Sequence, residues 1–128
     1  MVKTLRPTTA ELAILRVLWA AGPSTVRQVH DILRADRPIG YTTTLKALQV
    51  MTGKGLTIRD DRAGQHVYRP SQSEHETQRG LVGDLVDRAF GGSLSKLVMQ
   101  ALASRRASPQ ELREIRRLLA LRKETKNA

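Results

Sequence analysis

The stretch GYTTTLKALQVMTGKG, residues 40–55, decides the fold. Placed on a helix, its inward-facing positions fall on one stripe: Thr44, Leu45, Leu48 and Met51. The opposite side is small, polar and cationic, and it carries Thr42, Thr43, Lys46, Ala47 and Val50. Short side chains, hydroxyls and a lysine, with no acidic residue on the helix, suit entry into the major groove of DNA. Taken alone, the stretch fits an ordinary surface helix equally well.

The residues that follow this helix favour the DNA-binding interpretation. Gly53 and Gly55 are expected to end the helix, and the segments LTIRD (56–60) and QHVYRP (65–70) have strand-like alternation. The residues between them, 61–64, have turn chemistry and place Arg62 near the tip of a hairpin. A helix followed by a short hairpin, after two earlier helices, is the outline of a winged helix-turn-helix.

Two capping boxes predict the earlier helices. Thr8 with Glu11 begins the first, which is expected to end before Gly22, and Thr25 with Gln28 begins the second. Residues 35–40 then form the connector to the third helix. We expect phosphate contacts from the start of the second helix, from the end of the third and from the hairpin: Thr25, Arg27, Lys54 and Arg62, with Tyr68 supporting or touching the DNA backbone.

Three further amphipathic helices are predicted after Gln72, beginning at Ser73, Ser93 and Ser108. We therefore expect a winged-helix DNA-binding domain over residues 1–72 and a helical dimerisation domain over residues 73–128. So short a set of helices makes a poor core by itself, which predicts a homodimer. The expected dimer contacts are Leu81, Leu85, Val86, Phe90, Leu94, Leu97, Val98, Leu112, Ile115, Leu118 and Leu119.

The composition narrows the function class. The formal charge of +10 and the isoelectric point near 11.1 favour a polyanionic partner, nucleic acid first. The chain has no cysteine, which excludes disulfides and cysteine-based metal or redox sites. No segment has the length and apolarity of a membrane span or the pattern of a signal peptide, so we expect a cytoplasmic protein without membrane insertion.

Enzyme motifs are weak in this chain. Ser93 and Lys96 match the S-x-x-K of penicillin-recognising serine enzymes, but the accompanying S-D-N and K-T-G motifs are missing. The histidines lack the spacing of metal ligands, because the residue four positions after His75 is Arg79. We therefore expect no catalytic residue, no metal site and no cofactor.

With these features placed, the chain resembles the penicillinase-repressor family of the BlaI/MecI type. The resemblance lies in ELAILRVLW, GPSTVRQVHDIL, the Y-T-T at residues 41–43, GKGL, VYRP and RAFGGSLSKLV, which together cover roughly residues 8–122. It implies a mostly α fold with a small β-hairpin and a homodimeric repressor that binds a palindromic operator of double-stranded DNA. It also implies derepression by a membrane-bound sensor metalloprotease that cleaves the repressor.

The chain departs from the family pattern at three points. Val50 stands where the family usually has an arginine, which removes an expected DNA contact. The bond that corresponds to the family's Asn-Phe cleavage bond is Gln100–Ala101. The copper-responsive relatives use cysteines, so copper sensing of that kind is rejected. Two other functions remain open from the sequence: a winged-helix module that binds an acidic protein, and a DNA-binding protein without sequence preference.

Overall fold

A computed structural model describes residues 6–127, with side chains placed as far as residue 123. The chain forms two compact units that divide between Asp84 and Leu85. Over the described residues it contains six helices and one two-stranded antiparallel sheet. The predicted fold class, mostly α with a small β-hairpin, is confirmed.

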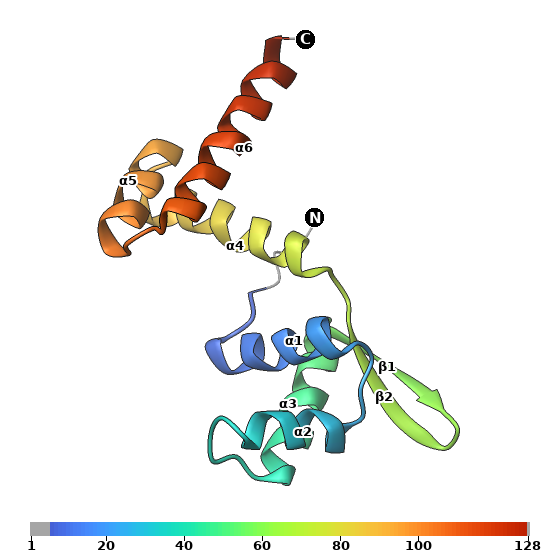
Figure 1. Ribbon diagram of the computed structural model, residues 1–128. Helices are drawn as coiled ribbons and strands as arrows, with labels where there is room; N and C mark the ends of the chain where they lie inside the picture. The colour runs from blue at the N-terminus through green and yellow to red at the C-terminus, as the bar shows by residue number, and fades with distance from the viewer. Residues whose placement is uncertain (1–5, 128) are drawn as a thin grey trace. The chain divides into compact units, whose positions relative to one another are not determined.

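The first unit begins with three helices and a hairpin (Figure 1). The helices are α1 (Thr9–Ala21), α2 (Val26–Arg34) and α3 (Tyr41–Lys54), and the strands are β1 (Thr57–Arg62) and β2 (Gln65–Pro70). The three helices pack on one another around a single core, and the hairpin extends from the end of α3 as a wing. This arrangement is a winged helix-turn-helix.

The core of this unit draws one apolar face from each element. Val29, Leu48 and Met51 have no exposed surface, and Leu18 is 1% exposed. Burying each of these side chains contributes about 1.5–3 kcal/mol relative to leaving it in water. Trp19 lies half-buried at the edge of the core, and its indole N–H donates to the carbonyl of Gln72 at 3.0 Å.

Side-chain caps set where the helices begin. At α1, the Glu11 N–H donates to Thr8 Oγ1 at 3.1 Å, and the Thr8 N–H donates to Glu11 Oε1 at 2.9 Å. The same reciprocal pair joins Thr25 and Gln28 at the start of α2. The caps predicted at Ser73, Ser93 and Ser108 also form, so each predicted helix start is confirmed.

Two turn assignments differ from the prediction. Gly53 lies inside α3, and only Gly55, with a φ of 84° in the left-handed region, ends the helix. The hairpin turn is shorter than residues 61–64, because Arg62 already pairs with Gln65 in the sheet. The two residues between them, Ala63 and Gly64, have φ values of 50° and 78°. Two consecutive residues with positive φ match the twist of a tight hairpin.

The helix α4 (Glu74–Ala89) begins in the first unit and ends in the second. Its first turns belong to the winged-helix unit, because Thr77 is buried and Arg6 forms an ion pair with Asp84 at 3.1 Å. The units therefore divide later in the chain than the domain boundary that we expected at Gln72.

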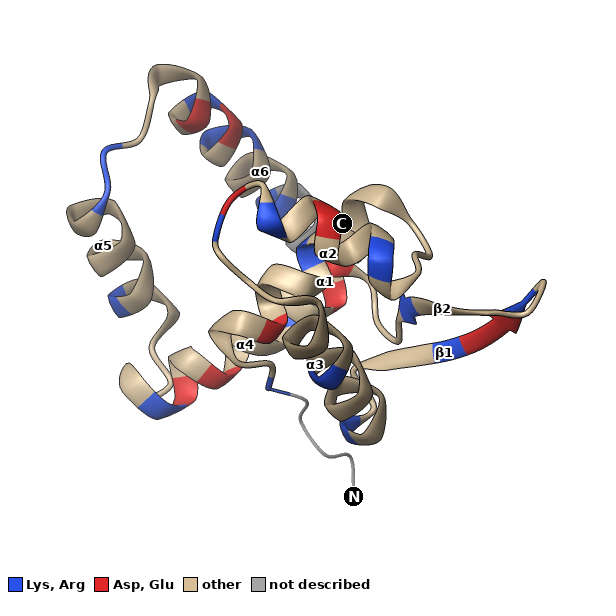
Figure 2. Cartoon of the chain, turned by 90° about the horizontal axis from the view of Figure 1, so that it is seen from below, with Lys and Arg blue, Asp and Glu red and all other residues tan. Residues whose placement is uncertain are grey.

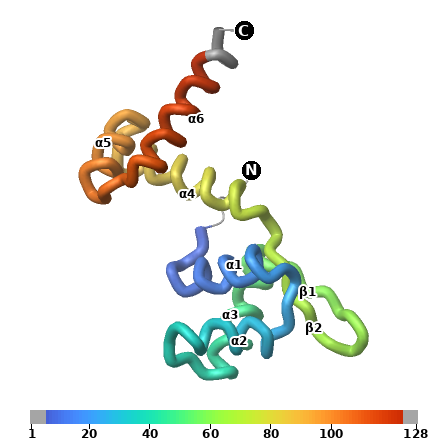
Figure 3. The backbone as a smooth tube through the Cα atoms, in the orientation of Figure 1, coloured from blue at the N-terminus to red at the C-terminus, as the bar shows by residue number. Residues whose placement is uncertain are grey.

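The second unit consists of the end of α4, α5 (Leu94–Ser104) and α6 (Pro109–Asn127), and the backbone trace follows these two helices to the C-terminal end (Figure 3). The polar segment from Leu121, expected to be a tail, continues α6 as helix to Asn127. No residue of α5 is buried. A helical unit with its apolar side chains largely in solvent lacks the core that a folded domain usually has.

Candidate nucleic-acid interface

The outer face of α3 is the predicted one. Thr42, Thr43, Lys46 and Val50 are exposed, whereas the opposite stripe of Thr44, Leu48 and Met51 has no exposed surface. Val50 itself is 48% exposed, which excludes a core role for it and confirms the predicted phase of the helix. The α3 ribbon carries blue basic segments in Figure 2, and its sequence holds no Asp or Glu.

A hollow of about 410 Å³ runs along this face, between α3 and the start of α1. Its lining combines small, polar and apolar side chains with one cation: Thr8, Ala10, Glu11, Thr42, Thr43, Lys46, Ala47 and Val50. Residues of this size leave the α3 backbone open to close approach by a large partner.

The first turn of α2 presents a second set of polar groups. Thr25 caps the helix, and the Arg27 guanidinium carbon lies 4.8 Å from the centre of the Tyr41 ring, a cation–π contact. The Tyr41 ring in turn meets His30 edge to face at 5.7 Å. Arg27 is therefore held between two helix starts, α2 and α3, by an aromatic side chain. Sequence reasoning did not assign Tyr41 any such role, because the contact depends on how the two helices pack.

The arginines of the wing are largely paired with its two aspartates. Asp60 lies 3.0 Å from Arg69 and 3.6 Å from Arg62, and Asp61 lies 2.5 Å from His66. Red and blue segments accordingly lie next to each other along the hairpin in Figure 2. The Arg62 side chain is 59% exposed, so it remains reachable, but the carboxylate of Asp60 weakens its pull on a second anion.

Lys54 has a different partner from the phosphate that we expected. Its ammonium lies 2.8 Å from Oε1 and 3.0 Å from Oε2 of Glu11, whose side chain is only 10% exposed. Burial alone would raise the pKa of the Glu11 carboxyl, but hydrogen bonds from Lys54 and from the Thr8 N–H leave that pKa below its ordinary value. Lys54 thus fixes the end of α3 to the start of α1.

Tyr68 also differs in part from the expectation. Its side chain is 1% exposed, so its ring belongs to the core and cannot lie along a DNA backbone. Its main chain bonds to Ser24 in both directions, at 2.8 and 2.9 Å, which ties β2 to the segment before α2. Tyr68 is therefore a support of the wing rather than a surface contact.

The residues assigned to dimerisation lie in the end of α4, α5 and α6. Four of them are partly buried within the single chain, and Leu97 and Leu112 are two of these. Others are strongly exposed, with 62% of Leu94, 53% of Leu118 and 65% of Leu119 accessible. Gln100 and Ala101 are both exposed and lie in the middle of α5.

The described part of the chain offers no alternative chemistry. Residues 6–127 contain no group of three His, Cys, Asp or Glu side chains placed to hold a metal ion. Within the same residues, no helix has both the length and the hydrophobicity needed to cross a bilayer.

Comparison with known proteins gives a consistent result. The profile of the penicillinase repressor family matches residues 7–121. The transcriptional regulator BlaI of Mycobacterium tuberculosis, in strains CDC 1551 and H37Rv, is 41% identical over 92 residues. That alignment covers 70% of this chain and 65% of the relatives, so the chain matches less than two thirds of their length. These relatives are named as regulators and not as enzymes.

The fold has a solved counterpart in the solution structure of monomeric Bacillus licheniformis BlaI in complex with the blaP half-operator. The two structures superpose with a TM-score of 0.52 at 22% identity, over 59% of this chain and 93% of the other. At that identity the likeness supports the winged-helix fold alone. The match of the family profile over nearly the whole chain decides the assignment: the chain belongs to the penicillinase repressor family.

Proposed function

We propose that the protein is a transcriptional repressor that binds an operator in double-stranded DNA. The observation that carries the proposal is the outer face of α3, where hydroxyls, a small apolar side chain and one unshielded lysine are exposed together without an acid. Thr42, Thr43 and Lys46 would read the major groove from this face, and Val50 would meet a thymine methyl or a sugar. The family membership and the operator complex of the Bacillus licheniformis relative support the same assignment.

Phosphate contacts would come from the elements that flank α3. Thr25 and Arg27 lie at the positive end of the α2 dipole, and the Arg62 side chain is exposed near the wing tip. We omit Lys54 from these contacts because its ammonium is bound to Glu11.

The repressor would act as a homodimer through its second unit. Leu94, Leu118 and Leu119 expose apolar surface that a single chain leaves in water, and burying such surface against a second copy is favourable. A dimer matches the two half-sites of a palindromic operator, because each subunit would place one α3 in the groove.

Derepression would follow from cleavage of the second unit by a membrane-bound sensor metalloprotease, with Gln100–Ala101 as the proposed bond. A cut there divides α5 and separates α6 from the rest of the chain. The bond lies within a regular helix, so the protease must first unwind α5 to reach it.

Titration of an operator fragment from the promoter of its own gene tests the proposal. Wild-type protein should bind this duplex more tightly than a scrambled duplex of equal length, and Lys46→Ala should weaken binding by about 1–3 kcal/mol. Gln72→Ala is the matched control, because its exposed side chain lies away from α3 and has no printed role in the core. Equal affinity for both duplexes would favour non-specific DNA binding, and no affinity for either would favour the protein-interaction module.

A further inference from the structure

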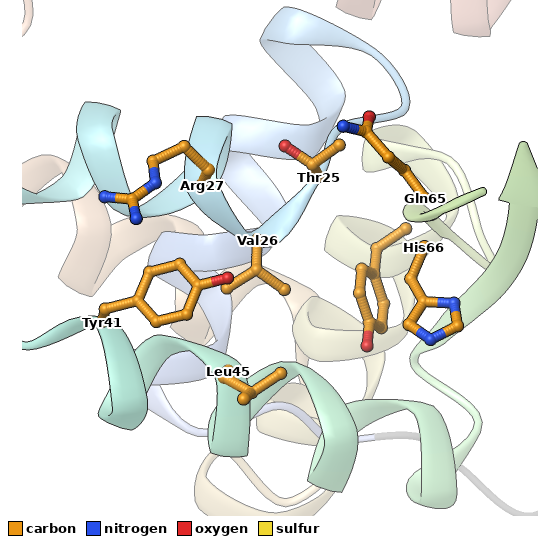
Figure 4. Close-up of a pocket in the computed structure, with 8 residues that line it drawn as sticks. Thr25, Val26, Arg27, Tyr41, Leu45, Gln65 and His66 are labelled. Atoms are coloured by element: carbon orange, nitrogen blue, oxygen red, sulfur yellow. The ribbon is translucent and has the colours of Figure 1, made fainter. Parts of the chain in front are cut away.

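A second hollow, of about 250 Å³, lies where α2, α3 and the wing meet (Figure 4). Its lining draws on the starts of both helices and on the strand β2. Most of the lining side chains carry a hydrogen-bond donor, and none carries a carboxylate: Thr25, Arg27, Tyr41, Gln65, His66 and Tyr68, with Val26 and Leu45 as the apolar wall. Three separate segments thus direct donors into one small space.

The Tyr68 hydroxyl is a strong sign of a ligand. The side chain is 99% buried by its 1% exposure, and no hydrogen bond to its hydroxyl is found among residues 6–123. No fully buried polar side-chain atom of the described chain lacks a partner, so the small accessible remainder of Tyr68 must include this hydroxyl. Because Tyr68 lines the hollow, a molecule placed there can supply the missing bond.

The neighbouring groups are also ready to donate. The Thr25 oxygen accepts from the Gln28 N–H at 3.2 Å, which leaves the Thr25 O–H hydrogen for another acceptor. The Arg27 guanidinium rests on the Tyr41 ring and, unlike the wing arginines, has no carboxylate partner within the described part of the chain. An aromatic face holds the cation in place without neutralising its charge.

We propose that this hollow is an oxyanion pocket that receives one phosphate group. A phosphate offers several acceptor oxygens in different directions, which matches hydroxyl, amide and guanidinium donors that arrive from three segments. The phosphate can come from a DNA backbone, in which case the inference rests on the proposed function, or from a small free phosphorylated molecule. In the first case Tyr68, although buried, adds to DNA binding through its hydroxyl alone.

The experiment uses the full-length protein and three variants. Tyr68→Phe removes only the hydroxyl and retains the ring in the core, and Arg27→Ala removes the cation. Ser95→Ala is the matched control, a hydroxyl removed from the exposed surface of α5. Thermal melting first establishes that each variant is folded.

The first arm is a titration with sodium phosphate at constant ionic strength, followed by amide NMR. We expect saturable shifts confined to residues 25–27, 41 and 65–68, and their loss in Arg27→Ala. The second arm is a titration with a mixed-sequence DNA duplex, in which Tyr68→Phe should weaken binding about tenfold while Ser95→Ala binds as the wild type does.

The arms separate the sources of the phosphate and separate this inference from the proposed function. A weaker DNA complex for Tyr68→Phe supports a backbone phosphate, and localised phosphate shifts with unchanged DNA binding support a free ligand. If wild-type protein fails to bind DNA but shows the localised shifts, the pocket stands and the repressor proposal falls. If DNA binds tightly to Tyr68→Phe and phosphate shifts are absent or spread over all basic residues, the pocket is overturned while the repressor proposal stands.

Discussion

Lys54, the last residue of α3, holds Glu11, in the first turn of α1, through both carboxylate oxygens at 2.8 and 3.0 Å. The same carboxylate accepts the N–H of Thr8, so one acidic side chain joins a helix cap to a distant helix end. This pair fixes the direction of α3, which carries the proposed DNA-reading face, relative to α1.

Replacing Glu11 with Gln should lower the free energy of unfolding by about 1–2 kcal/mol at neutral pH, because the charged bond to Lys54 is lost. The folded-state pKa of Glu11 lies below the ordinary value of 4.5. The ionised group therefore stabilises the fold above that pH, and this contribution disappears as the pH falls through the lowered pKa. Denaturant unfolding between pH 7 and pH 3 measures both effects.

In that experiment the wild type and Glu11→Gln should converge in stability at the acidic end. Asp31→Asn, an exposed acid on α2, is the control and should follow the wild-type pH dependence. A constant difference between wild type and Glu11→Gln across the whole range would contradict the role of the ionised carboxylate.

Replacing Val50 with Arg should strengthen binding to an operator by about 1–3 kcal/mol where a guanine or a phosphate is in reach. The site is 48% exposed, so the free energy of unfolding should change by no more than about 0.5 kcal/mol. Thermal melting and DNA titration of the one variant check both statements. Unchanged affinity would remove this position from the proposed interface.

Replacing Ala63 with Asn should stabilise the winged-helix unit by about 0.5–1 kcal/mol, because Ala63 has a φ of 50° and asparagine tolerates the left-handed region better. The reciprocal variant Gly64→Ala, at a φ of 78°, should destabilise it by about 1 kcal/mol. Thermal melting of the two variants gives opposite signs if the hairpin turn is as described. Two shifts of the same sign would show that another turn forms in solution.

Replacing Leu119 with Glu should shift the protein from dimer to monomer, because it places a charge in an apolar surface that is 65% exposed in the single chain. Sedimentation velocity at micromolar concentration measures the change. Ile32→Glu is the control, since Ile32 is 48% exposed on α2 of the other unit and should leave the association unchanged. A Leu119→Glu variant that sediments like the wild type would exclude this face from the interface.

Binding to DNA should weaken with salt, and log K should fall by about 0.9 for each phosphate neutralised. Arg27→Ala should make that slope shallower by about 0.9 for each Arg27–phosphate contact removed. Arg62→Ala should change the slope less, because Asp60 already lies 3.6 Å from the Arg62 guanidinium. Equal slopes for wild type and Arg27→Ala would show that Arg27 does not contact phosphate.

Local sequence patterns predicted the helix starts and the phase of α3 correctly. A capping box such as Thr25 with Gln28 involves residues of one helical turn, so its spacing is visible in the sequence. The exposure of Val50 beside the buried Met51 likewise follows from helical periodicity.

Contacts between elements were not predictable in the same way. Sequence reasoning read Lys54 as a free cation, because its partner Glu11 comes from another helix. It placed Tyr68 at the wing surface, because strand alternation leaves open which side of a two-stranded hairpin is covered by helices. Arg27 on the Tyr41 ring depends in the same way on how α2 packs beside α3.

The pair of backbone bonds between Ser24 and Tyr68 has a mechanical consequence. It makes the segment before α2 a single-residue third strand, so the hairpin and the head of α2 move as one lever rather than as two jaws. Such a lever meets its target already assembled and surrenders little chain freedom on contact. A cut or an insertion between Gly22 and Thr25 would therefore uncouple the wing from the helices even if every side chain at the surface were preserved.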